Sequence, residues 1–257
     1  MHPIAFFLGT LPIRWYGVMM ALAFWFGLWT ATRRARLANV HGEIIADVTM
    51  WLMFGSIVGA RLVWVITYWK TDLAGQPFSE VFMIQHGGLV FYGGLMGATI
   101  TGISYLVWKK LPVWNIADIL APSIALGSVF GRIGCLMNGC CYGRICEMPW
   151  AIHFPASHET AGAPVHPTQI YDALLNLALY FALAGLFRRR QFQGQILALY
   201  FIGYALCRSI VECFRGDYPA DHIHAGLFTS AQLVSVPILV AGLALYFWRK
   251  NLPGKPS

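Results

Sequence analysis

Seven long apolar stretches, separated by short polar segments, run along the chain. They cover residues 15–32, 44–67, 89–108, 113–130, 168–187, 194–213 and 227–248. Each is close to the roughly 20 residues that an α-helix needs to cross the hydrocarbon core of a bilayer. The pattern therefore predicts an all-α protein, a single integral membrane domain over residues 1–257 with about seven transmembrane helices.

The composition predicts the same class of protein. Hydrophobic residues make up 58% and charged residues only 11% of the 257 residues, and the mean hydropathy is +0.59. Charged residues account for about 25% of an ordinary soluble domain. The bilayer is therefore the expected solvent, and few residues remain for a soluble domain.

The positive charges predict the orientation of the chain. Most of the Lys and Arg residues lie in four short clusters, at 33–36, 109–110, 188–190 and 249–255, and each cluster follows an odd-numbered stretch. Because such residues gather in cytoplasmic loops, we expect the N-terminus outside, the C-terminus in the cytoplasm and outward-facing segments near 68–88, 131–167 and 214–226. The net charge of +7 is spread over these loops and does not indicate a nucleic-acid partner.

The remaining seven cations are not explained by orientation. They are Arg14, Arg61, Lys70, Arg132, Arg144, Arg208 and Arg215. An arginine inside a span is costly unless it is paired or lines a polar cavity, so this set indicates an anion site that opens outward. A second interpretation has Arg14 and Lys70 extending to lipid headgroups and Arg208 pairing with Glu212 one helical turn away.

The segment 131–144 contains the densest set of candidate functional residues. It is too glycine-rich for an ordinary helix, and its glycines, Gly143 among them, allow close backbone approach. Arg132, Asn138 and Arg144 add hydrogen-bond donors, and the combination is suited to holding a phosphate. The alternative is a tightly packed re-entrant turn.

A second glycine-rich segment, 86–97, opens the third stretch at its predicted outer end. Gly93 and Gly97 form a small-residue face on which a neighbouring helix can pack. His86 and Tyr92 are candidates for proton transfer. Packing alone would also explain the glycines.

Two polar islands interrupt apolar stretches at their predicted outer ends, at 166–172 and 212–217. They add His166, Glu212 and Arg215 as candidate site residues. Since Pro167 suits the first turn of a helix, the first island is also interpretable as a helix cap.

Six cysteines complete the candidates, and four of them, Cys135, Cys140, Cys141 and Cys146, fall in one predicted outward segment. Their spacing is not the paired CxxC pattern of zinc sites or of thioredoxin-like motifs, so we expect no metal. An oxidising compartment would permit disulfides among them, and the sequence does not pair them.

Several of these segments together resemble the prolipoprotein diacylglyceryl transferases of bacterial inner membranes. The resemblance is carried by residues 14–17 (RWYG), 87–95 (GGLVFYGGL), the signature within 131–144, 166–171 (HPTQIY) and 210–215 (IVECFR), in the order typical of the family. It implies seven spans and transfer of the diacylglyceryl group of phosphatidylglycerol to the lipobox cysteine thiol of a prolipoprotein. Glycerol-1-phosphate would leave, and no cofactor is implied.

The resemblance also assigns individual residues. Essential arginines of the family correspond to Arg132 and Arg215, its first-span tyrosine to Tyr16 and its signature glycine to Gly143. With Asn138, Arg144, His166 and Glu212, these form the expected phosphatidylglycerol site.

Three positions depart from the family pattern. Tyr92 replaces a catalytic histidine, and Cys135 and Cys140 replace the asparagine and glutamate of the signature. The reference pKa of tyrosine is about 10 and that of histidine about 6.5. We therefore expect Tyr92 to donate a hydrogen bond or relay a proton. His86 or His166 is then the candidate base, or arginines lower the pKa of the substrate thiol directly.

Two other functions fit parts of the sequence. The adjacent Cys140 and Cys141 suggest a membrane thiol–disulfide oxidoreductase, although no CxxC is present. Arginines at mid-depth also line the pathways of anionic-lipid transporters. A lipid-modified peptide product would separate the transferase from both.

Overall fold

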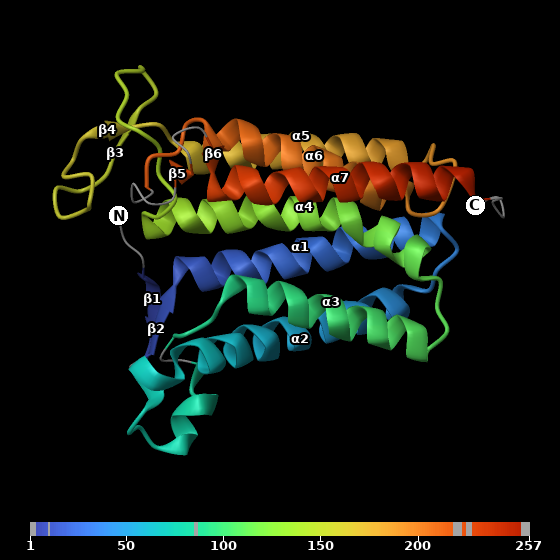
Figure 1. Cartoon of the computed structure of the whole chain (residues 1–257), viewed down its shortest axis with the longest axis horizontal. Coiled ribbons are helices and arrows are strands. Elements are labelled where there is room, and N and C mark those ends of the chain that lie inside the picture. The colour runs from blue at the N-terminus through green and yellow to red at the C-terminus, as the bar shows by residue number, and fades with distance from the viewer. Residues whose placement is uncertain (1–3, 10, 85–86, 218–222, 225–227, 253–257) are drawn as a thin grey trace. The chain divides into compact units, whose positions relative to one another are not determined.

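The computed structural model describes residues 4–9, 11–84, 87–217, 223–224 and 228–252. Each of the seven predicted stretches is a helix (Figure 1). The helices are α1 (Trp15–Leu37), α2 (Gly42–Tyr68), α3 (Phe91–Trp108), α4 (Val113–Asn138), α5 (Thr168–Phe187), α6 (Gln195–Glu212) and α7 (Ser230–Asn251). The prediction of a predominantly helical chain is confirmed.

Five helical segments of the described chain are long and apolar enough to cross a membrane. They are Gly42–Leu73, which includes the short helix η1 (Trp69–Leu73), Val113–Asn138, Thr168–Phe187, Gln195–Glu212 and Ala231–Asn251. Helices α1 and α3 fall outside this set. The structure therefore supports a multi-pass membrane protein, whereas seven spans remain a prediction.

Short strands accompany the helices, and the all-helical prediction did not include them. Three antiparallel pairs join β1 (Ile4–Leu8) with β2 (Leu11–Arg14), β3 (Ile152–His153) with β4 (Pro164–Val165), and β5 (Ile223–His224) with β6 (Phe228–Thr229). Two-residue strands carry too little apolar periodicity to be recognised in a sequence.

The contacts divide the chain into two compact units, residues 39–116 and residues 1–38 with 117–257. In the first unit, α2 packs against α3 through glycines. A Cβ atom added at Gly97 would lie 2.1 Å from the carbonyl oxygen of Gly55, and one at Gly93 would lie 2.4 Å from that of Gly59. The predicted small-residue face on α3 is confirmed, and α2 is the helix that packs on it.

Arg61 of α2 has a structural role in this unit. Its guanidinium donates to the carbonyl oxygens of Val81 at 2.9 Å and Gly87 at 2.6 Å, and it lies 4.3 Å from the ring centroid of Trp64. This arginine therefore ties the segment between α2 and α3 to α2. Because the Arg61 guanidinium is already bound to these backbone carbonyls, it is not expected to bind an anion.

In the second unit, α1 lies beside α4, and α6 packs against both α5 and α7 (Figure 1). Thr30 and Ser123 share a buried hydrogen bond of 3.0 Å between their hydroxyls, and Phe26 stacks on Phe130 with ring centroids 5.3 Å apart. The guanidinium of Arg34 donates to the Ile119 carbonyl at 3.0 Å. These contacts fix the α1–α4 pair, whose ends carry part of the candidate site.

Candidate functional site

The signature arginine stands on a helix. The sequence predicted that residues from Gly131 onward leave helical structure, and this prediction is wrong, because α4 continues to Asn138. An apolar segment in a bilayer stays helical even where glycine is frequent, because its backbone groups have no water to bind and must form hydrogen bonds within the helix. A Cβ at Gly131 would meet nothing within 4 Å, whereas one at Gly134 would lie 3.1 Å from Cδ2 of Tyr16. The absence of a side chain at Gly134 thus allows the Tyr16 ring to pack against α4. Tyr16 lies in the first turn of α1 and is 45% exposed.

Helix α4 ends in a Schellman cap. Gly139 has a φ of +82°, its amide donates to the Leu136 carbonyl at 3.3 Å, and the Cys140 amide donates to the Cys135 carbonyl at 3.1 Å. In this cap the chain folds back over the last helical turn. Cys140 is therefore brought over Cys135, and Asn138, the last helical residue, is exposed beside them.

The cap is fastened to the start of α5. Gln169 donates through Nε2 to the Cys140 carbonyl at 2.7 Å, and Thr168 donates through its hydroxyl to the Cys141 carbonyl at 2.6 Å. Both side chains are buried. Cys141 itself has a φ of +62°, which costs a non-glycine residue roughly 1–2 kcal/mol. The two α5 side chains help to hold this turn in place.

Three segments that are distant in the sequence meet at Gly143 and Arg144. The Gly143 amide donates to the His166 carbonyl at 3.0 Å, and the Arg144 amide donates to the Phe214 carbonyl at 2.9 Å. Gly143 forms an antiparallel bridge with Arg215, and the Arg144 Nε donates to the Arg215 carbonyl at 3.0 Å. The structure thus brings together four of the predicted site residues.

Gly143 is required by this junction. A Cβ atom there would lie 2.5 Å from the His166 Cβ and 2.8 Å from the Phe214 carbonyl oxygen. No side chain larger than hydrogen fits between these segments. The role of Gly143 in the structure is therefore close approach of backbones, as its place in the glycine-rich segment predicted.

His166 lies against aromatic rings at the same junction. Its Nδ1 is 3.1 Å from the Tyr171 hydroxyl, and its ring meets that of Phe214 edge-on with centroids 5.4 Å apart. The Tyr171 hydroxyl also accepts a hydrogen bond of 2.7 Å from Trp150. These contacts fix the orientation of the imidazole ring.

Each of the two key arginines is paired with a carboxylate. Arg132 Nε lies 2.7 Å from Asp172 Oδ2, and Arg215 donates to both carboxylate oxygens of Asp217, at 2.9 and 2.7 Å. The sequence assigned both arginines to a phosphate and did not predict these partners. The two pairs are neighbours, since Asp172 is within electrostatic range of both Arg132 and Arg215.

The predicted pairing within α6 is confirmed. Arg208 Nη2 lies 3.0 Å from Glu212 Oε2, and the Glu212 side chain is fully buried. Arg208 also acts electrostatically on Asp172. Glu212, expected to contact phosphatidylglycerol, is therefore positioned to hold Arg208 near the Arg132–Asp172 pair.

A mainly apolar groove lies directly beside Arg132. It has a volume of about 250 Å³ and runs between α4 and α5, lined by Val129, Arg132, Ile133, Leu136, Gln169, Ile170, Ala173, Leu174 and Leu177. A guanidinium at the edge of an apolar groove suits a ligand with a charged head and a hydrocarbon chain. Gln169 adds a buried Oε1 that has no hydrogen-bond partner within the described residues.

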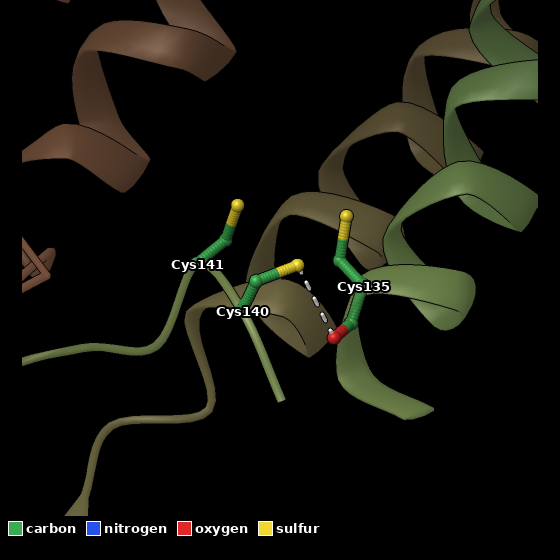
Figure 2. A group of neighbouring side chains, drawn as sticks. All are labelled: Cys135, Cys140 and Cys141. Carbon is green, nitrogen blue, oxygen red and sulfur yellow. Dashed lines mark hydrogen bonds between the residues drawn. The ribbon is translucent and has the colours of Figure 1, made fainter. Parts of the chain in front are cut away.

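Three cysteines converge at the end of α4, as Figure 2 shows. The sulfur atoms of Cys135, Cys140 and Cys141 all lie within 4.8 Å of one another. Thiol hydrogen bonds from Cys135 and Cys140, followed by the nearby charges of Arg215 and Arg132, lower the pKa of Cys141 below its usual value. All six cysteines are free thiols. Their spacing along the sequence had not indicated this convergence.

The two proton-transfer candidates fall in the other unit or outside the described chain. Tyr92 is the second residue of α3 and 60% exposed, and its ring contacts that of Phe91 edge-on at 5.8 Å. His86 lies outside the described residues. Of the candidate bases, only His166 is therefore seen at the arginine junction.

Sequence reasoning missed three residues of this site. Asp172 and Asp217 pair with the key arginines, and Gln169 spans the α4 cap and the groove. Asp172 and Gln169 lie in the polar run 166–172 at the start of α5, where a buried carboxylate in an apolar helix was the available signal.

Comparison with known proteins identifies the family of the chain. The sequence pattern of the family described as prolipoprotein diacylglyceryl transferase matches residues 3–248. The chain belongs to this family. The family's description supports diacylglyceryl transfer and supports neither of the two rival functions.

Curated relatives of nearly the same description match along most of their length. The phosphatidylglycerol–prolipoprotein diacylglyceryl transferase of Glaesserella parasuis is 35% identical over 248 residues, covering 95% of this chain and 91% of the relative. The enzyme of the same name from Geobacter sulfurreducens is 35% identical over 247 residues, covering 95% and 93%, and that from Synechococcus elongatus is 32% identical over 260 residues, covering 96% and 88%. This transferase is therefore an enzyme of lipoprotein biosynthesis.

Proposed function

We propose that the chain transfers the diacylglyceryl group of phosphatidylglycerol to the lipobox cysteine thiol of prolipoproteins, at the outer leaflet of a bacterial inner membrane. The observation that carries the site assignment is Arg132, which stands beside the groove between α4 and α5 next to the Gly143–Arg144–Arg215 junction. The groove accepts an acyl chain, and the guanidinium groups hold the phosphate. The relatives are named for the same donor and acceptor.

Carboxylate pairing prepares the arginines for this role. Asp172 engages Arg132 through Nε, so the Nη groups of Arg132 bind phosphate oxygens while the plane of the guanidinium is held. Arg144 donates to the Arg215 carbonyl, which keeps these two arginines on one side of the junction. Fixed donors stabilise charge that develops in a transition state without a cost of reorganisation.

The chemical step is a displacement at carbon. The substrate thiol loses its proton, and its sulfur forms a bond to the glyceryl CH₂ carbon as the bond from that carbon to the phosphate oxygen breaks. Glycerol-1-phosphate leaves with the bonding electron pair, and Arg132 and Arg215 balance its charge. The proton passes to a base, for which His166 and His86 are the candidates, and Tyr92 donates a hydrogen bond or relays the proton.

The expected orientation places this chemistry outside the cytoplasm. Seven spans, an outer N-terminus and a cytoplasmic C-terminus follow from the four Lys and Arg clusters. Tyr16, Asn138, Gly143 and Glu212 then belong to the outer half of the protein with the arginines. The partners are phosphatidylglycerol and the signal peptides of prolipoproteins.

The decisive experiment uses mass spectrometry of a lipobox peptide incubated with the purified chain and phosphatidylglycerol. The unmodified chain is expected to add one diacylglyceryl unit. Arg132→Lys retains a positive charge for Asp172 but lacks the two-pronged contact with phosphate. It should therefore lose at least about 100-fold in rate, as when one oxyanion donor is removed.

The matched control is Arg189→Lys, in an exposed segment far along the chain from the site, which should react at the rate of the unmodified chain. Thermal unfolding of each variant in detergent separates lost chemistry from lost folding. Full activity of a folded Arg132→Lys variant would contradict the proposal that Arg132 binds the phosphate through two contacts. Absence of any mass gain with the unmodified chain would contradict the transfer itself.

A further inference from the structure

The three cysteines at the end of α4 lie close together, and the proposed transfer reaction does not use them. Within the described residues, Cys135, Cys140 and Cys141 form the one group of three or more His, Cys, Asp or Glu side chains whose ligand atoms lie this close together. All three are partly exposed. Figure 2 shows Cys135 on the helix and the other two on the turn that folds back over it.

The helix cap produces this arrangement and holds it. In a Schellman cap the residue after the left-handed glycine lies over the last helical turn, and here those positions are Cys140 and Cys135, whose backbones are joined at 3.1 Å. Gln169 and Thr168 fix the carbonyls of Cys140 and Cys141. The ligands are therefore organised before any ion arrives.

The spacing of the sulfur atoms fits a single metal ion. Three thiolates around one ion at a metal–sulfur distance of about 2.3 Å would stand about 4 Å apart in a trigonal plane. The observed separations, all within 4.8 Å, require movements smaller than an ångström. Side-chain rotations of partly exposed cysteines supply such movements.

The ligand chemistry selects the ion. Thiolates are soft ligands that favour Cu(I) and zinc, but structural zinc sites are almost always four-coordinate. Among the described residues, no fourth Cys, His or carboxylate ligand atom lies within the same 4.8 Å of these three sulfurs. Cu(I) with three thiolates carries two negative charges, and Arg132 and Arg215 lie within electrostatic range of Cys141 to offset them.

We propose that Cys135, Cys140 and Cys141 bind one Cu(I) ion through their three sulfur atoms. Each thiol releases its proton as the ion binds, and no electron is transferred. Two of the three ligands stand where the resemblance places an asparagine and a glutamate. The site is independent of the proposed transfer reaction.

The test is an anaerobic titration of the full-length, reduced chain in detergent with Cu(I) supplied as its bicinchoninate complex. One Cu(I) per chain is expected, and X-ray absorption should show three sulfur neighbours. Cys135→Ser, Cys140→Ser and Cys141→Ser should each weaken binding by at least about tenfold, since even outer-shell changes at metal sites cost 10–100-fold. Cys146→Ser and Cys207→Ser, outside the cluster, are the matched controls and should bind as the unmodified chain does.

Three results would overturn the site. One is equal affinity in the cluster variants and the controls. Another is a Cu(I) spectrum dominated by nitrogen or oxygen neighbours. The third is a Cys135–Cys140 disulfide, seen as a loss of two hydrogen masses, in chain isolated from cells without added reductant. None of these readouts depends on transferase activity, so a failed titration leaves the proposed function standing.

Discussion

Gly143 connects the conformation of one residue to the whole arginine site. Its amide and that of Arg144 bind the carbonyls of His166 and Phe214, and its Cα lies where any side chain would overlap both segments. Arg144 and Arg215 flank this position. A change at Gly143 therefore displaces Arg144 and Arg215, two of the proposed phosphate donors, although Gly143 contributes no side chain.

We predict that Gly143→Ala destabilises the chain and Gly131→Ala does not. Overpacking costs about 1–3 kcal/mol, and the added methyl at Gly143 would lie 2.5 Å from the His166 Cβ. At Gly131, inside α4, the methyl meets nothing within 4 Å, and replacing a helical glycine by alanine gains about 0.5–1 kcal/mol. Thermal unfolding in detergent measures both. An equally stable Gly143→Ala variant would contradict the crowded junction.

Sequence reasoning at this scale succeeded for local pairs and failed for distant ones. Arg208 and Glu212 are four positions apart on one helix, so their ion pair could be predicted from helical geometry alone. Arg132 and Asp172 stand on different helices, and nothing in the local sequence couples them. The cysteine cluster likewise depends on the three-dimensional path of a cap.

At the scale of elements, the glycines of α3 determine how closely two helices approach. Without a hydrophobic driving force between helices in lipid, close packing of small residues holds them together. The Cα of Gly97 faces the backbone of Gly55 and Gly59 on α2. This pairing was predictable from the four-residue spacing on α3, but its partner helix was not.

We predict that Gly97→Ala weakens the α2–α3 pair more than Gly94→Ala does. A Cβ at Gly97 would lie 2.1 Å from a backbone oxygen that cannot move away, whereas one at Gly94 has its nearest neighbour, the Ser56 Oγ, at 3.1 Å. Overpacking costs of about 1–3 kcal/mol should appear as a lower midpoint of unfolding in detergent for Gly97→Ala. Similar midpoints for the two variants would argue against backbone contact at Gly97.

The end of α4 was the main error among the elements. Glycine disfavours helix in water by about 1 kcal/mol relative to alanine, which suggested a break after residue 130. The helix instead continues through Gly131 and Gly134 and stops at Gly139. Apolar helical spans tolerate interior glycines for packing, and here Gly134 provides room for Tyr16.

For the whole molecule, the charge pattern predicts the orientation in the membrane, which contacts within the chain do not test. Four cationic clusters predict that the C-terminal ends of α1, α3, α5 and α7 lie on the cytoplasmic side of the membrane. They are at residues 33–36, 109–110, 188–190 and 249–255. The opposite side then receives the arginine junction. Composition and charge thus predict the class of protein and its orientation, whereas the carboxylate partners of the arginines are found only in the three-dimensional structure.

We predict opposite activities for two alkaline phosphatase fusions. Alkaline phosphatase fused after Ser157, between β3 and β4, should be active because it is exported to the oxidising compartment in which its disulfides form. A fusion after Arg189 should be inactive, because the 188–190 cluster stays in the cytoplasm. Green fluorescent protein at the same two points is the reciprocal control. Activity of the fusion after Arg189 would reverse the proposed orientation.

The meeting of residues 143–144, 166 and 214–216 also has a consequence for biogenesis. The segments are joined by backbone hydrogen bonds, yet the third is made only after α6 has been synthesised. A nascent polypeptide still lacking α6 holds Arg132 without Arg215 beside it. The growing chain is thus unable to assemble the full arginine set until its sixth helix has left the ribosome, so the proposed phosphate site forms only near the end of translation.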